Sequence, residues 1–120
     1  MANELSVDVA VAFTKTGSET ITVRKPAQAV TVAGTRGAML TQKIAITEEQ
    51  VDIGELPTVG WVYFENMDAT NYIELFITTG GTAFARLLPG RGFAMPIFAA
   101  TFYAKSHTAA CWLRTVPFEQ

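Results

Sequence analysis

The first part of the chain alternates between apolar residues and small or polar ones. The apolar set lies at the odd positions of residues 5–13: Leu5, Val7, Val9, Val11 and Phe13. Since successive side chains of a strand point to opposite faces, this period of two predicts a strand with one apolar face. Shorter β-branched runs predict strands at 20–24, 28–33 and 39–47, with an interruption at Pro26.

The second half carries aromatic-rich runs separated by polar or glycine turns. They predict strands at 61–66, 72–78, 83–88, 93–98, 101–105 and 110–116. The connection 66–71 is rich in Asn, Asp and Thr, which predicts a hairpin between the strands on either side of it. Pro96 cannot donate to a ladder, so the run 93–98 is expected either to lie at a sheet edge or to be irregular.

One segment departs from the strand pattern. Thr47 and Gln50 have the spacing of a helix capping box, and Gly54 and Pro57 end the segment. Either a short helical turn or an acidic loop fits residues 47–57, and it is the only helix candidate in the sequence.

Many short strands without a long helix predict an all-β fold, an antiparallel, jelly-roll-like β-sandwich of about eight to ten short strands. The chain of 120 residues has the size of one domain, 1–120. Residues 1–6 are a candidate N-terminal arm, because chain termini are often ordered only by a partner.

Composition changes this picture in one respect. Hydrophobic residues make up 49% of the chain and charged residues 17%, whereas about 25% charged residues is typical. A small domain with so little charge is expected to cover part of its surface with another chain. The net charge is −2, and the nine Lys and Arg residues are scattered, which argues against nucleic acid and against a membrane surface as partners. No signal peptide or apolar run of about 18 residues is present, so synthesis in a cytoplasm is expected.

Little in the sequence predicts chemistry. One histidine, His107, and one cysteine, Cys111, cannot form a zinc cage, and Cys111 is expected to be a small buried hydrophobe. The acidic loop that holds Glu48, Glu49 and Asp52 lacks the order of a calcium loop. No base accompanies a nucleophile in a known motif. We therefore expect no enzyme, no metal and no cofactor.

Aromatic residues supply the candidate interface. In the strand 72–78, Tyr72, Glu74 and Phe76 share one face, and the aliphatic residues between them share the other. Aromatic residues are enriched in interfaces. The candidate interface residues are Trp61, Tyr63, Tyr72, Phe76 and Trp112. Stacking of these rings on sugars, as in a carbohydrate-binding module, is the alternative.

Three motifs resemble small virion proteins of tailed bacteriophages: the Gly-aromatic and Asn-X-Asp-X-Thr-Asn-Tyr pattern in 60–74, the Leu-X-Pro-Gly turn in 84–90, and the Tyr-Ala-Lys strand in 102–109. Ser106 stands where that group is expected to have alanine. The resemblance covers about residues 60–112 and implies a decoration or cement protein on the capsid exterior. It implies no catalytic residues.

Such a protein would contact itself and the major capsid protein. A shell with threefold points favours a homotrimer. The candidate capsid contacts lie in the arm and in the acidic loop: Asn3, Glu4, Leu5, Glu48, Glu49 and Asp52. A neck or tail protein forming a ring of six or twelve is the other structural alternative.

Overall fold

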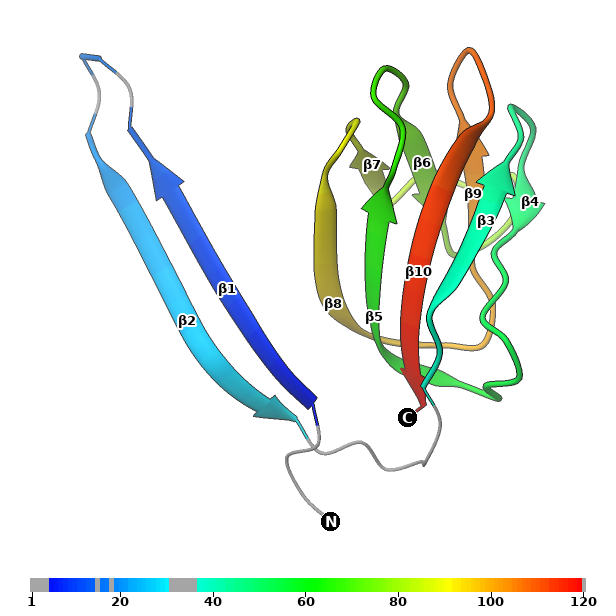
Figure 1. Ribbon diagram of the computed structural model, residues 1–120, viewed down its shortest axis with the longest axis horizontal. Coiled ribbons are helices and arrows are strands. Elements are labelled where there is room, and N and C mark those ends of the chain that lie inside the picture. The colour runs from blue at the N-terminus through cyan, green and yellow to red at the C-terminus, as the bar shows by residue number, and fades with distance from the viewer. Residues whose placement is uncertain (1–4, 15, 18, 31–36, 120) are drawn as a thin grey trace. The chain divides into compact units, whose positions relative to one another are not determined.

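The computed structural model describes residues 5–14, 16–17, 19–30 and 37–119. Within these ranges the chain forms strands and turns and no helix, which confirms the all-β prediction. The strands are β1 (Leu5–Phe13), β2 (Ile21–Val30), β3 (Leu40–Ile44), β4 (Glu49–Gln50), β5 (Val59–Asn66), β6 (Ile73–Phe76), β7 (Ala85–Leu87), β8 (Gly92–Ala99), β9 (Tyr103–Ser106) and β10 (Cys111–Glu119) (Figure 1).

The chain contains two compact units, Met1–Val32 and Ala33–Gln120. The first unit holds an antiparallel two-stranded ribbon of β1 and β2. The second unit holds eight strands in two four-stranded sheets, ordered β3-β10-β5-β8 and β4-β9-β6-β7. A β-sandwich-like arrangement therefore belongs to the second unit.

Pro26 does not end a strand, contrary to expectation. β2 continues through it, and residues 28–30 of the expected third strand belong to β2, while 31–33 lie outside the described residues. The register shifts at this place: Val7 pairs with Gln28 and Val9 with Lys25, so two residues of β2 oppose one of β1. A bulge of this kind accommodates a residue that lacks an amide hydrogen.

The two sheets of the second unit share one core. Phe64 of β5 and Leu113 of β10 belong to one sheet, Leu75 of β6 belongs to the other, and Phe102 precedes β9; all four are fully buried in one cluster. The Phe64 ring packs against the Phe102 ring edge to face at 5.8 Å. Burying side chains of this size contributes about 1.5–3 kcal/mol each, so these contacts hold the two layers together.

The predicted hairpin between 61–66 and 72–78 is wrong. β5 pairs with β10 and β8, whereas β6 pairs with β7 and β9. The connection crosses from one sheet to the other and is fixed by the side chain of Asn66, which is fully buried. Its Nδ2 donates to the carbonyl oxygens of Asn71 and Leu87, each at 2.9 Å, and its Oδ1 accepts from the Asp68 amide at 2.9 Å.

The segment 47–57 forms no helical turn. It contains the short strand β4 and a turn in which the carboxylate of Asp52 accepts from the Gly54 amide at 2.8 Å. Gly54 has a φ of 70°, which a residue without a side chain adopts most easily. β8, which contains Pro96, forms an edge of its sheet as predicted.

Candidate functional site

The outer face of the sheet β3-β10-β5-β8 is largely apolar along β10, β5 and β8. Cross-strand register places Phe118, Trp61 and Pro96 in one row and Val116, Tyr63 and Ala94 in the next. Directly opposed residues share a face of the sheet. Phe98 continues the outward alternation of β8 and is 77% exposed. We call this set the aromatic face: Trp61, Tyr63, Ala94, Pro96, Phe98, Val116 and Phe118.

Two glycines allow the rings of this face to pack closely against their neighbours. A Cβ on Gly92 would lie 2.5 Å from the Tyr63 hydroxyl, and one on Gly37 would lie 3.2 Å from the Phe118 ring. Tyr63 therefore crosses the start of β8, and Phe118 covers the backbone that leads to β3. Close packing of this kind fixes the aromatic side chains in place, which lowers the entropy that binding would cost.

A polar group borders the aromatic face. Glu65 accepts hydrogen bonds from the Tyr63 hydroxyl and from Arg114 Nη1, both at 3.2 Å. Partial burial raises the pKa of Tyr63, and the hydrogen bond to Glu65 adds to the rise. Charged groups at the margin of an apolar patch resemble the polar rim of a protein interface.

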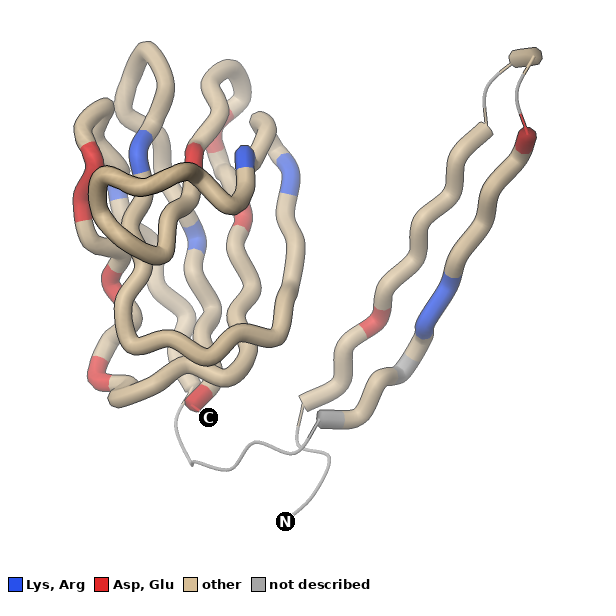
Figure 2. The backbone as a smooth tube through the Cα atoms, turned by 180° about the vertical axis from the view of Figure 1, so that it is seen from behind, with Lys and Arg blue, Asp and Glu red and all other residues tan. Residues whose placement is uncertain are grey.

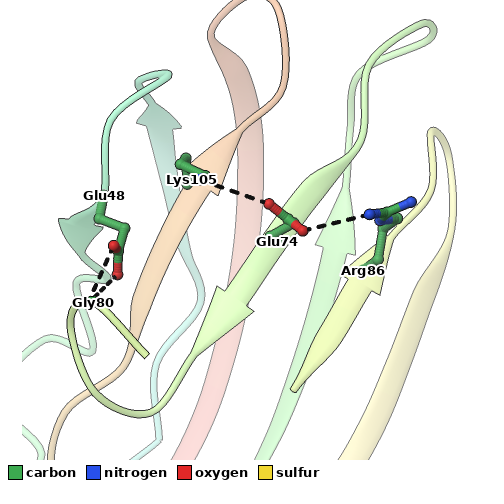
Figure 3. Close-up of polar contacts among 5 residues, drawn as sticks. All are labelled: Glu48, Glu74, Gly80, Arg86 and Lys105. Atoms are coloured by element: carbon green, nitrogen blue, oxygen red, sulfur yellow. Dashed lines mark hydrogen bonds and ion pairs between the residues drawn. The ribbon is translucent and has the colours of Figure 1, made fainter. Parts of the chain in front are cut away.

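The outer face of the other sheet, β4-β9-β6-β7, has a different character. Glu74 of β6 lies between Arg86 and Lys105, with N–O distances of 3.6 and 3.9 Å (Figure 3). The Arg86 guanidinium lies 4.3 Å from the centre of the Tyr72 ring, and His107 stacks on that ring at 4.5 Å. These paired charges suit solvent or a polar partner. We call this surface the charged face.

The five candidate interface residues therefore divide between two surfaces. Trp61 and Tyr63 lie together on the aromatic face. Trp112 is on the same side of that sheet but beside Lys43, beyond Arg114, and is 49% exposed. Tyr72, which immediately precedes β6, belongs to the charged face, and Phe76, the last residue of β6, is 5% exposed. Phe76 thus offers little surface to a partner.

Some of the candidate capsid contacts already form hydrogen bonds within the chain. Glu49 accepts from Gln42 and from the Ala45 amide, each at 3.0 Å. Glu48 accepts from the Gly80 amide at 3.0 and 3.2 Å (Figure 3). Asp52 holds the turn at Gly54. These carboxylates order the loops on which they lie.

The candidate N-terminal arm falls partly outside the described chain. Asn3 and Glu4 lie outside it, whereas Leu5 is the first residue of β1 and pairs with Val30. The element described at this end is thus a two-stranded ribbon whose strands span residues 5–30, and residues 5 and 6 of the expected arm belong to β1.

The ribbon has an exposed apolar face of its own. Val11 opposes Val23, Phe13 opposes Ile21, and Val9 opposes Lys25. The five apolar members are 40–56% exposed. We call this set the ribbon apolar face: Val9, Val11, Phe13, Ile21 and Val23.

Sequence reasoning did not select Phe98, Val116 and Phe118 as interface residues. The usable signal was the alternation of 111–119, in which Cys111, Leu113 and Thr115 are buried and the residues between them point outward. Which strands place their outward residues side by side depends on strand order, which no local pattern contains.

Cys111 and the acidic side chains are the groups that the sequence offered for chemistry. Cys111 is 1% exposed, and burial raises the pKa of its thiol, so its prediction as a small buried hydrophobe is confirmed. Among the residues that the structure describes, no three His, Cys, Asp or Glu side chains are grouped to hold a metal ion. Within those same ranges, no helical segment has the length and apolarity needed to cross a membrane.

Searches against protein-family models, curated proteins and solved structures returned no match for this chain.

Proposed function

We propose that this chain is a non-enzymatic structural protein of a tailed-phage virion, a decoration or cement protein that stabilises the capsid from outside. It acts as a homo-oligomer, a trimer at threefold points of the shell. The aromatic face is the observation that carries this proposal. A rigid sheet surface with ordered aromatic side chains and a polar margin has the composition of a protein interface.

The strand order supports a jelly roll. Counted from β3, the first, eighth, third and sixth strands form one sheet, and the second, seventh, fourth and fifth form the other. Two interlocked Greek keys give this order, and jelly rolls occur in viral capsid proteins and in lectins. One fold can serve many functions, so the function has to be inferred from the surfaces of the protein.

The contrast between the two outer faces supports an oriented assembly. The aromatic face includes Phe98 at 77% exposure, whereas the charged face has the ion pairs of Glu74 with Arg86 and Lys105. Burial of the aromatic face would stabilise contact between copies. The ion pairs of the charged face can stay hydrated at little cost. Many copies on one shell would bind multivalently, so each contact with the capsid protein needs only modest affinity.

The test uses the full chain and variants of the aromatic face. Light scattering on a sizing column should give a mass about three times the chain mass of 13.0 kDa. Phe98→Ser and Trp61→Ser should lower that mass and reduce binding to phage heads assembled without this chain. Leu88→Ser is the matched control, because Leu88 is 51% exposed and lies outside the aromatic face.

Each result separates the alternatives. A monomer in solution that also fails to bind heads would overturn the proposal. A ring of six or twelve would indicate a neck or tail protein.

One observation favours a second candidate, a carbohydrate-binding module: Trp112 is 49% exposed beside Lys43. The jelly roll that we propose for the second unit also occurs in lectins. Glycan binding that is lost in Trp112→Ala or Trp61→Ala would support that alternative.

A further inference from the structure

We propose that the β1–β2 ribbon pairs face to face with the ribbon of a second copy of this chain, in antiparallel orientation about a twofold axis. This inference concerns the first unit alone and goes beyond the proposed function. It does not depend on what the sandwich of the second unit binds.

A ribbon of two strands needs a cover on its apolar face. An isolated two-stranded hairpin is marginally stable in water, and the ribbon apolar face leaves Val11 and Val23 54% and 56% exposed at its centre. Five such side chains on one face give the ribbon a continuous apolar stripe. Burying them would supply the stability that two strands lack.

The charges on this face identify the occupant. Lys25 opposes Val9 and so shares the face with the apolar residues. Continuing the alternation of β2 past Ile21 leads to Glu19, which is exposed, at the opposite end of the stripe. The stripe therefore runs from a positive end, through an apolar centre, to a negative end. The colours along the ribbon in Figure 2 show a blue stretch on β2 and a red position near the hairpin tip.

Such a stripe is complementary to its own inverted copy. Place the twofold axis midway between the Val11–Val23 row and the Phe13–Ile21 row. Each of these rows then faces the other row of the partner ribbon, and the level of Lys25 faces the level of Glu19. Packed sheets lie about 10 Å apart, a gap that the extended side chains of a lysine and a glutamate span together.

The same two residues cannot pair within one chain. Six residues along a strand correspond to about 20 Å, which exceeds the reach of both side chains. Among the described residues, neither Lys25 nor Glu19 forms an ion pair. A parallel arrangement would bring Lys25 to the same level as Lys25 of the second copy and away from Glu19, so the charges favour the antiparallel one.

The footprint of a ribbon is smaller than that of a stable dimer, which buries about 800 Å² per partner. The pairing should therefore depend on concentration and add to contacts made elsewhere. In an assembly, it would join one oligomer to the next.

Charge reversal tests the pairing on the full chain by sedimentation velocity over a range of concentrations, in a Phe98→Ser background. Lys25→Glu and Glu19→Lys should each weaken association about tenfold, because twofold symmetry repeats every unfavourable contact. The double variant Glu19→Lys/Lys25→Glu should restore it. Arg24→Glu is the matched control, since Arg24 pairs with Ala10 on the opposite face of the ribbon.

The outcomes decide the proposal. Restoration by the double variant, with Arg24→Glu unchanged, supports antiparallel pairing. Three results would overturn the proposal: association unchanged in Lys25→Glu, association reduced equally in Arg24→Glu, or association still weak in the double variant. Each would indicate that something else covers the apolar face of the ribbon. Thermal unfolding of the sandwich, followed by tryptophan fluorescence, checks that each variant is folded, because Trp61 and Trp112 lie in the second unit.

Discussion

Tyr63 lies directly over Gly92: a Cβ at that glycine would be 2.5 Å from the tyrosine hydroxyl and 3.1 Å from the carbonyl oxygen of Phe64. Gly92 begins β8 and pairs with Glu65 of β5. The absence of a side chain at Gly92 is therefore what lets the Tyr63 ring lie across β8. Tyr63 belongs to the aromatic face, so this contact links a glycine to the proposed interface.

Gly92→Ala should destabilise the fold by about 1–3 kcal/mol, the usual cost of forcing an extra carbon into a packed place. Elsewhere, replacing glycine by alanine in a strand is favourable or neutral. The measurement is the free energy of unfolding from urea titration. In a Tyr63→Ala background the cost of Gly92→Ala should fall, because the displaced ring is gone. An unchanged cost would assign the strain to the Phe64 carbonyl instead.

The stability of the fold should decrease in alkali through Tyr63. Burial raises its pKa above 10.0, and Glu65 adds to the rise. The folded state thus holds the phenol proton more tightly than the unfolded state. The stabilising contribution is complete below pH 10.0 and is lost as the pH rises through the raised pKa.

Unfolding of wild type and Tyr63→Phe at a series of alkaline pH values measures this effect. The difference between their free energies of unfolding should shrink as the pH increases beyond 10.0. Tyrosinate absorbance gives an independent reading: the titration step missing from Tyr63→Phe should lie above pH 10.0. A step at or below that pH would contradict the prediction.

Asn66→Ala should cost about 3 kcal/mol, because it removes three hydrogen bonds of a buried side chain and leaves the Leu87 carbonyl oxygen without this donor. Denaturant titration measures the loss. Asn71→Ala is the control, since Asn71 takes part in this network through its backbone. Its replacement should change stability by less than about 1 kcal/mol. Equal losses would show that local turn propensity, and not the bridge to Leu87, holds the loop.

The sequence predicted the strands well where apolar residues alternate with small or polar ones. The alternation of 5–13 matches β1, and the run 110–116 lies within or next to β10. It could not predict the pairing of β5 with β10, because residues 66–71 favour a turn whether the chain reverses within one sheet or crosses to the other. Asn66 decides between these by bonding to Leu87, a contact 21 positions along the chain.

The candidate site was also predicted only where neighbouring residues of one strand determine it, and not where the pairing of distant strands does. Trp61 and Tyr63 share a face because both lie on β5, which the period of two predicts. Tyr72 joins a different surface because it immediately precedes β6, which belongs to the other sheet. Pro26 lies inside β2 because a bulge in the partner register accommodates it, and the sequence of β2 alone does not reveal that partner.

The position of β10 governs the order of events during synthesis. It lies between β3 and β5 and pairs with both, yet it is translated after the other nine strands that the structure describes. Until it leaves the ribosome, β3 and β5 have hydrogen-bonding edges with no strand between them. Such edges are sites of aggregation, and pairing of distant segments is slow. The sheet therefore cannot close in the nascent chain until β10 has been translated.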